Sequence, residues 1–332
     1  MPQNTQVVIA SVPNGPLEPK HFDVRESAAP EVADGAVLCR TLALTIGAGQ
    51  RAGLQGSASY AGAPKAGVVM GGTGVARVEA SKAAGFAPGD LVVGPTGWQL
   101  YSTHKPPALR KVPSAADPAL HLGVLGTNGL TAYFGLLDLG QPKAGNTVVV
   151  SAAAGSVGHI VGQIAKRMRC RVVGVAGSDA KCDLLVRELG FDVAINYKDG
   201  DFRAAFKDAT PNRIDVYFDN TGGDILGSAL FRMNAHGRIV CCGAVSQYDT
   251  ANPAGSPRGI PGLLVNNRVR MEGFLVFDYA NRYDEARAEM TRWIERGELK
   301  PRVTEFKGLA SAPRAFIELL HGDTIGTTIV RA

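Results

Sequence analysis

The 332-residue sequence has few cysteines, and none of them is spaced as a metal-binding pair. The five are Cys39, Cys170, Cys182, Cys241 and Cys242, and the C-x-x-C spacing of a structural zinc site is missing. An odd number of cysteines in a chain of this size also argues against a disulfide framework. We therefore expect a reducing, cytoplasmic setting.

Long apolar runs are missing as well. The N-terminus has no basic segment followed by an apolar core, and the uncharged stretches at 118–137 and 144–165 are interrupted by glycine and polar residues. We find no internal repeat and no low-complexity segment. The sequence predicts neither a signal peptide nor a membrane span.

Clustered positive charge is the third absence. The net charge is +5 and the isoelectric point is near 9.0, but lysine and arginine are spread along the chain without a basic block. This pattern does not favour nucleic-acid binding. A mild bias toward anionic cofactors explains it more simply.

Zinc ligands are not indicated either. A catalytic zinc ion needs three protein ligands with compatible spacing. The six histidines at 21, 104, 121, 159, 236 and 321 have no paired cysteine or Gly-His-Glu context. We interpret His159 as a surface residue at the start of a helix, and we assign no metal.

What the sequence does contain is a strand, a tight turn and a helix between residues 147 and 166. The apolar run 148–150 ends in a small-residue turn with Gly155 and Gly158, and a helical apolar pattern follows. Such a turn lets backbone N–H groups approach a pyrophosphate. The spacing is A-x-x-G-x-x-G rather than G-x-G-x-x-G, so a small-residue packing corner is the alternative.

Strands and helices alternate after this turn. Strands are expected at 171–175, 193–196, 214–219 and 238–242, and helices at 179–189 and 283–296. The alternation predicts an α/β fold with a doubly wound parallel sheet. A helix over 123–140 is expected to lead into it.

The first part of the chain has short β-type segments at 37–43, 67–80 and 90–93, punctuated by glycine and proline. They predict an antiparallel β barrel. We expect one domain from residues 1–125 plus 299–332, and an inserted dinucleotide-binding domain at 126–298.

The second strand of the nucleotide unit is not followed by an acid. An NAD site usually places a carboxylate there for the ribose 2′-hydroxyl, whereas Val175 is followed by Ala, Gly and Ser. Ser178, Lys181 and Tyr197 suit a 2′-phosphate, which favours NADP(H). Singly, these residues are also explained as a helix cap, a solvated lysine and a half-buried strand end.

Several longer motifs resemble a known family. They include 129–137 (GLTAYFGLL), 161–166 (VGQIAK), 173–178 (VGVAGS), 218–223 (FDNTGG), 237–248 (GRIVCCGAVSQY) and 326–330 (GTTIV). Over nearly the whole chain the sequence is similar to the zinc-free double-bond reductases among the medium-chain dehydrogenases/reductases. That branch includes prostaglandin reductases, plant alkenal reductases and bacterial curcumin reductases, and the bacterial type looks most similar.

The resemblance implies a GroES-like β-barrel catalytic domain, an inserted Rossmann domain, NADPH and a homodimer. It also implies a set of cofactor-binding residues: Thr131, Gly155, Ser156, Val157, Gly158, Gly177, Ser178, Lys181, Tyr197, Asn220, Cys242, Gly243, Ala244, Ser246, Tyr248, Phe274, Leu275 and Val276. The implied reaction is hydride transfer from NADPH to the β-carbon of an α,β-unsaturated aldehyde or ketone.

The sequence departs from the family at the expected substrate pocket. Residues 46–51 read Ile-Gly-Ala-Gly-Gln-Arg instead of Val-Asp-Pro-Tyr-Met-Arg, and residues 127–128 read Thr-Asn instead of Met-Pro. Thr324 and Thr327 replace an asparagine and a lysine, and Phe277 replaces a tyrosine of some mammalian members. The expected pocket residues are Arg51, Tyr60, Phe277 and Tyr279.

Tyr248 is the candidate catalytic residue. An enone that accepts hydride leaves charge on an enolate oxygen, and a phenol there stabilises it. The alternative is that Tyr248 only walls the pocket, which is also the role we expect for Cys242. The loop 252–262 is either a lid or a surface connection. A quinone reductase and a non-catalytic NADPH-binding redox sensor remain open as alternative functions.

Overall fold

The computed structural model describes residues 2–58, 62–113, 117–251 and 257–332, which form two compact units. Unit 1 comprises Met1–Gly123, Asp249–Ala251 and Val303–Ala332, and unit 2 comprises Val124–Tyr248 and Asn252–Arg302. The sequence-based boundaries were 125/126 and 298/299. The short stretch that returns to unit 1 at Asp249 has no signal in the sequence.

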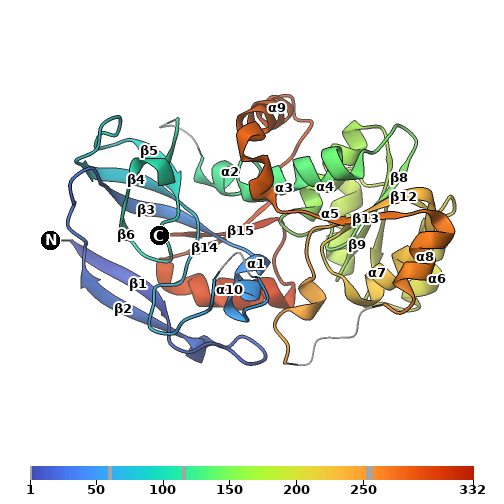
Figure 1. Ribbon diagram of the computed structural model, residues 1–332, viewed down its shortest axis with the longest axis horizontal. Helices are drawn as coiled ribbons and strands as arrows, with labels where there is room; N and C mark the ends of the chain where they lie inside the picture. The colour runs from blue at the N-terminus through green and yellow to red at the C-terminus, as the bar shows by residue number, and fades with distance from the viewer. Residues whose placement is uncertain (1, 59–61, 114–116, 252–256) are drawn as a thin grey trace. The chain divides into compact units, whose positions relative to one another are not determined.

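Unit 2 is built on a six-stranded sheet in which all neighbouring strands are parallel (Figure 1). Its order is β10 (Val193–Asn196), β9 (Arg171–Ala176), β8 (Thr147–Val150), β11 (Ile214–Asp219), β12 (Met233–Cys241) and β13 (Arg270–Gly273). This confirms the predicted doubly wound sheet. The order reverses between β8 and β11, which is where such sheets bind ligands beyond the carboxyl ends of the strands.

Helices cover this sheet. They are α4 (Gly158–Arg167), α5 (Asp179–Arg187), α6 (Phe202–Ala209), α7 (Gly223–Leu230) and α8 (Ile260–Asn267), whereas α3 (Thr127–Phe134) and α9 (Tyr283–Glu295) pack against each other. All four residues of β8 are buried, as expected for a parallel strand covered on both faces. Val149, Val173, Tyr217 and Ile239 from four neighbouring strands form the centre of one hydrophobic core.

The segment before β8 differs from the single helix expected at 123–140. It consists of α2 (Pro118–Leu122), a turn, α3 and one wider π-helical stretch, Gly135–Gly140. Asp117 begins α2 by accepting a hydrogen bond from the Ala119 N–H. At Gly129 an added Cβ would lie 1.7 Å from the Val124 carbonyl oxygen, so the turn packs directly against α3.

Unit 1 contains a seven-stranded sheet and a separate hairpin. The sheet runs β14 (Val303–Lys307), β15 (Thr327–Arg331), β3 (Val37–Ile46), β4 (Gly74–Ser81), β5 (Leu91–Gly94) and β7 (Arg110–Val112), and β6 (Tyr101–His104) also pairs with β3. The hairpin is β1 (Gln3–Ile9) with β2 (Phe22–Ala28). All described strand pairs within the first 112 residues are antiparallel, as expected for that part of the chain, and the C-terminal tail adds β14 and β15, which are parallel to each other.

Trp98 lies at the centre of the unit 1 core. Its side chain is fully buried, with its ring stacked 5.6 Å from Phe22 and edge-on at 5.8 Å to Phe316. Phe316 comes from α10 (Ala312–His321), and α1 (Ala48–Leu54) follows β3. Short 3-10 turns lie at Pro19–His21, Pro106–Ala108, Val245–Gln247, Val276–Arg282 and Leu309–Ser311. Among the described helices, none has the length and apolarity needed to cross a membrane.

Candidate functional site

The glycine turn joins β8 to α4 at the point where the strand order reverses. At Gly158 an added Cβ would lie 2.3 Å from the Ala152 carbonyl oxygen and 2.8 Å from the Ala153 Cα, so only glycine fits. Ala152 itself has a φ of +46°, a conformation that L-residues rarely adopt. Within the described chain, the N–H groups of Ser156, Val157 and Gly158 meet no acceptor. Free N–H groups at the start of a helix suit an anion, and the binding of a pyrophosphate here stays a prediction.

His159 does not lie on the surface, so that prediction was wrong. Its side chain is 1% exposed. One ring nitrogen, Nδ1, is 2.8 Å from the Gly155 carbonyl oxygen, and the other, Nε2, accepts the Arg302 N–H at 3.2 Å. Burial lowers the pKa of His159 to about 4 and keeps the ring neutral. Nothing in the sequence indicates that residues 300–302 return to cover this helix.

The expected 2′-phosphate residues gather at the end of β9. Ser178 caps α5 by accepting the Lys181 N–H at 3.4 Å. An added Cβ at Gly177 would lie 3.2 Å from the Tyr197 ring and 3.4 Å from Cε of Lys198. Lys198 is a residue that the sequence analysis missed, although it directly follows Tyr197, and its ammonium lies 5.9 Å from that ring. Together these residues bring a hydroxyl, a phenol and the Lys198 side chain to one strand end, and Lys181 lies in the first turn of α5.

A buried carboxylate, also missed, organises the end of β11. Asp219 Oδ1 accepts hydrogen bonds from Ser151 Oγ (3.2 Å), the Tyr217 hydroxyl (3.0 Å) and the Gly222 N–H (2.9 Å). Asp219 is 2% exposed, and burial raises its pKa despite these donors. Asn220 Nδ2 donates to the Ser151 carbonyl at 2.7 Å. Asp219 and Asn220 thus fix the turns after β8 and β11 against each other.

The segment after β12 packs on the same turn. The N–H groups of Cys242 and Gly243 donate to the Asp219 carbonyl at 2.8 and 3.1 Å, and Ser246 Oγ donates to the Thr221 carbonyl at 2.6 Å. Burial raises the pKa of Cys242 to about 12, so its thiol stays protonated. This state suits a wall residue and not a nucleophile.

Tyr248 is the last residue of this segment. Its phenol oxygen accepts the Ala244 N–H at 3.3 Å, and an added Cβ at Gly243 would lie 3.9 Å from that oxygen. Because the oxygen acts as an acceptor here, its own proton is available to a further acceptor. The Tyr248 hydroxyl therefore lies at the backbone that follows β12, where Gly243 approaches the Asn220 carbonyl.

The remaining expected residues of unit 2 lie in or near an aromatic cluster. Tyr279 stacks on Phe134 with centroids 4.7 Å apart and an interplanar angle of 14°, and Phe274 meets Tyr279 edge-on at 6.4 Å. Val276 is buried, whereas Leu275 and Phe277 are 41% and 58% exposed. Thr131, on α3, donates from its hydroxyl to the Thr127 carbonyl at 2.7 Å.

Arg51, expected in the substrate pocket, is 1% exposed in unit 1. Its Nε donates to Asp249 Oδ1 at 2.8 Å and its Nη2 donates to the Gly15 carbonyl at 2.6 Å. The structure thus pairs Arg51 with Asp249, which begins the short segment Asp249–Ala251 that returns to unit 1. Tyr60 and part of the loop 252–262 lie outside the described residues, and from Ile260 onward that loop is helix α8.

The departures in unit 1 have local roles. Gln50 accepts the Gly47 N–H at 2.8 Å and so begins α1 without the family's proline. Thr324 and Thr327 are 8% and 1% exposed. An added Cβ at Gly123 would lie 2.9 Å from the hydroxyl oxygen of Thr327, which is therefore packed beside the end of α2.

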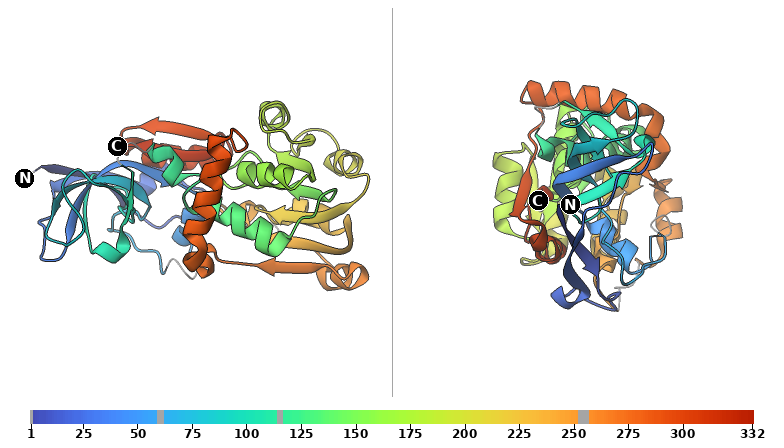
Figure 2. Two further views of the ribbon diagram at one scale, coloured as in Figure 1. Left: turned by 90° about the horizontal axis from the view of Figure 1, so that it is seen from above. Right: turned by 90° about the vertical axis from the view of Figure 1, so that its left-hand side faces the viewer.

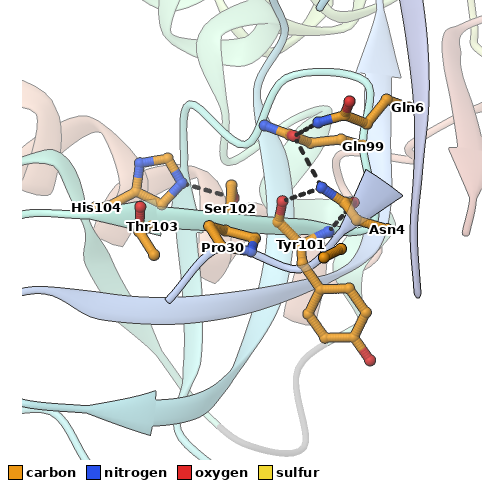
Figure 3. Close-up of a pocket in the computed structure, with 9 residues that line it drawn as sticks. Asn4, Gln6, Pro30, Gln99, Tyr101, Ser102, Thr103 and His104 are labelled. Atoms are coloured by element: carbon orange, nitrogen blue, oxygen red, sulfur yellow. Dashed lines mark hydrogen bonds between the residues drawn. The ribbon is translucent and has the colours of Figure 1, made fainter. Parts of the chain in front are cut away.

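A separate cavity of about 290 Å³ lies on unit 1 between the hairpin and β6. Figure 3 shows its polar lining, in which Asn4, Gln6 and Gln99 hydrogen-bond to one another and to the chain. Because these amides already have partners, the cavity has no assigned role. Among the described residues, no group of three or more histidine, cysteine, aspartate or glutamate side chains could hold a metal ion.

Two family models match the chain. One, described as a zinc-binding dehydrogenase, covers residues 156–295, and the other, described as the N-terminal domain of an oxidoreductase, covers residues 5–112. The described residues offer no ligand set for the zinc ion that the first name implies.

Known proteins are similar over most of the length. NADPH-dependent curcumin reductase of Escherichia coli is 38% identical, over 99% of this chain and 97% of the relative. NADP+-dependent 2-alkenal reductase of Nicotiana tabacum is 44% identical, over 78% and 76%. Among solved structures, CurA from Vibrio vulnificus in complex with NADPH superposes with a TM-score of 0.95. Its sequence is 39% identical, and the match covers 99% of each chain.

A parallel sheet with a glycine turn at its switch point, inserted into a mixed β unit, defines a medium-chain dehydrogenase/reductase with Rossmann and GroES-like domains. Within that class, the chain belongs to the double-bond reductase family that includes the curcumin and 2-alkenal reductases.

Proposed function

We propose that this protein uses NADPH to reduce the C=C bond of α,β-unsaturated aldehydes and ketones. The observation that carries the proposal is the 38% identity to a curcumin reductase over 99% of the chain. The glycine turn and the polar side chains at the end of β9 support it independently. Curcumin-like enones and alkenals are the substrate class that we propose.

We propose that unit 2 holds the cofactor. The N–H groups of Ser156, Val157 and Gly158 take the pyrophosphate, where glycine leaves the space that a side chain would fill. Ser178, Lys181, Tyr197 and Lys198 take the 2′-phosphate. The residues beside the nicotinamide are Thr131, Asn220 and the segments 242–248 and 274–276. NADPH, when bound, supplies the hydride. The structured N-terminal and C-terminal parts, close to 1–125 and 299–332, form the substrate domain.

Tyr248 is the residue to which we assign enolate stabilisation and proton donation. A phenol that donates to the carbonyl oxygen stabilises the negative charge that develops there as hydride reaches the β-carbon. The α-carbon then takes up a proton from Tyr248 or from water. Tyr60, Phe277 and Tyr279 remain proposed pocket residues.

We further propose a cytoplasmic homodimer. All five cysteines are free thiols, which suits a reducing compartment. In the described part of the chain β13, the orange strand in Figure 2, lies at one edge of its sheet, and β10 lies at the other. The neighbouring α8 exposes Val265 by 72%. An open strand edge beside an exposed apolar helix suits pairing with a second copy.

The function is tested by following NADPH oxidation at about 340 nm with an alkenal, an alkenone, curcumin and a quinone, and by identifying the products by mass. We expect saturated carbonyl products, a strong preference for NADPH over NADH and no effect of a zinc chelator. An allylic alcohol as product, or turnover with the quinone alone, would contradict the proposal. NADPH binding without turnover of any acceptor would select a non-catalytic function.

A further inference from the structure

His159 touches the glycine turn through a contact that the proposed function does not use. The Gly155 carbonyl oxygen accepts both the backbone N–H of His159 at 3.2 Å and a contact from its Nδ1 at 2.8 Å. On the other side of the ring, the Arg302 N–H points at Nε2. The imidazole therefore lies between the turn and the last residue of unit 2.

These contacts determine which nitrogen carries the proton. A backbone N–H can only donate, so Nε2 must be the acceptor in the bond with Arg302. In a neutral ring the proton then resides on Nδ1, which donates to the Gly155 carbonyl. Burial favours the neutral ring, since the side chain is 1% exposed and its pKa is lowered to about 4. Arg302 thus fixes the tautomer that the glycine turn requires.

The Gly155 carbonyl and the Ser156 N–H belong to one planar peptide group and point in opposite directions. A donor that holds the carbonyl therefore also fixes the direction of the Ser156 N–H. That N–H is one of the turn donors without an acceptor among the described residues. The His159 backbone N–H also holds this carbonyl, at 3.2 Å, and the imidazole adds a second donor at 2.8 Å where glycine has wide backbone freedom.

We propose that His159 is a positioning residue for cofactor binding, which holds the Gly155–Ser156 peptide so that its N–H faces the pyrophosphate of NADPH. The inference rests on the proposed function, because it assumes that this turn binds the dinucleotide. It assigns the tautomer-setting role to the Arg302 N–H.

A neighbouring side chain provides a matched control. Gln163, one turn further along α4, accepts the Lys300 N–H at 2.7 Å and donates to the Lys300 carbonyl at 3.2 Å. It holds the same returning segment as His159 and donates to the His159 carbonyl at 2.9 Å, but among the described residues no hydrogen bond joins it to Gly155. If NADPH binding weakened only because residues 300–302 had loosened, substitution of either His159 or Gln163 would weaken it.

Two substitutions of similar size test the two ring nitrogens of His159 one at a time. In His159→Asn the amide nitrogen can take the place of Nδ1 and donate to Gly155, whereas in His159→Gln the amide oxygen can take the place of Nε2 and accept from Arg302. The dissociation constant for NADPH is measured by the change in NADPH fluorescence, with Gln163→Leu as control. Steady-state KM and kcat with an alkenone are measured in parallel.

We expect His159→Gln to weaken NADPH binding and raise its KM about five- to tenfold, with kcat within about twofold, because one hydrogen bond to the turn is lost. His159→Asn and Gln163→Leu should stay within about twofold of the parent protein. Equal losses in His159→Gln and Gln163→Leu, or a larger loss in His159→Asn, would overturn the inference. NADPH binding without alkenone turnover would contradict only the proposed function, whereas failure of the parent protein to bind NADPH would contradict both.

Discussion

At the scale of single residues, the end of β9 gathers groups that can hold a phosphate dianion. Ser178 both caps α5 and presents its hydroxyl there, beside Tyr197 and Lys198. The carboxylate of Asp179, the next residue along the chain, accepts a hydrogen bond from Asn196 Nδ2 at 3.0 Å. The cofactor preference should therefore depend on the charge at position 178.

Ser178→Asp tests this preference with little cost to the fold, because aspartate is as good a helix cap as serine. The new carboxylate repels a 2′-phosphate, so we expect the KM for NADPH to rise at least about tenfold while that for NADH changes little. Steady-state kinetics with both cofactors measure the change. Equal KM changes for the two cofactors would contradict a 2′-phosphate site here.

Tyr248→Phe removes the proposed proton donor and keeps the ring. We expect kcat for an alkenone to fall about 100-fold, within the range for general acid catalysis, while the dissociation constant of NADPH stays within about threefold. Stopped-flow measurement of a single turnover separates the chemical step from binding. If Tyr248 only walls the pocket, KM will change and kcat will not.

His159 should also make stability depend on pH. An unfolded histidine takes up a proton near its ordinary pKa of 6.5, whereas the folded ring does so only near 4. The stabilisation is therefore complete above about pH 6.5 and is lost as the pH falls toward 4, by about 3 kcal/mol in total. Urea unfolding of the parent protein and His159→Gln between pH 4 and 8 should show a difference that shrinks in acid. A pH-independent difference would contradict this.

Residue roles that depend on local pattern could be predicted from the sequence, and those that depend on distant chain could not. Ser178 and Gly158 follow from the strand, turn and helix pattern around them. His159 was misplaced because its burial comes from Arg302, which is 143 residues away. Asp219 was missed because its partners Ser151 and Tyr217 come together only once the parallel strands have paired.

At the scale of elements, α4 packs very closely against the Phe191 side chain at Gly162. An added Cβ at Gly162 would lie 1.9 Å from the tip of the Phe191 ring, so the helix packs directly on that side chain. The sequence predicted the helix from its apolar spacing, and it predicted β8 from its valine run. It did not predict the break before α3, because that break depends on the contact between Gly129 and the Val124 carbonyl.

Gly162→Ala should therefore destabilise the protein by about 1–3 kcal/mol through overpacking. Phe191→Leu leaves room at this contact, so the double variant should lose less stability than the sum of the two single variants. Thermal unfolding of the four proteins measures this coupling. Additive losses would mean that the two residues do not share the contact.

At the scale of the whole molecule, the chain passes between its two units more often than the sequence indicated. Residues Asp249–Ala251 belong to unit 1, although the residues on both sides belong to unit 2. Asp249 has a φ of +57° and accepts hydrogen bonds from Arg51 Nε and from the Leu17 N–H at 2.6 Å. This buried ion pair holds the crossing segment in unit 1.

Asp249→Ala leaves the guanidinium of Arg51 buried without its counter-ion, which should cost about 3–5 kcal/mol. The double variant Arg51→Met with Asp249→Leu should be more stable than Asp249→Ala alone, because no charge is left unpaired. Arg331→Ala, which removes a half-exposed pair with Glu305, should cost less than about 1 kcal/mol and serves as control. Thermal unfolding ranks the variants, and equal losses for Asp249→Ala and Arg331→Ala would contradict the prediction.

The pairing of β3 with β15 has a consequence for synthesis on the ribosome. The Thr45 hydroxyl donates to the Thr328 carbonyl, 283 residues further along the chain, and β15 separates β3 from β14 in the sheet. All six strands of the parallel sheet have emerged before β15 is translated. The nascent protein therefore carries an open edge on β3 until the final residues arrive. Because unpaired strand edges promote aggregation, the early sheet has to remain soluble for most of the time that translation takes.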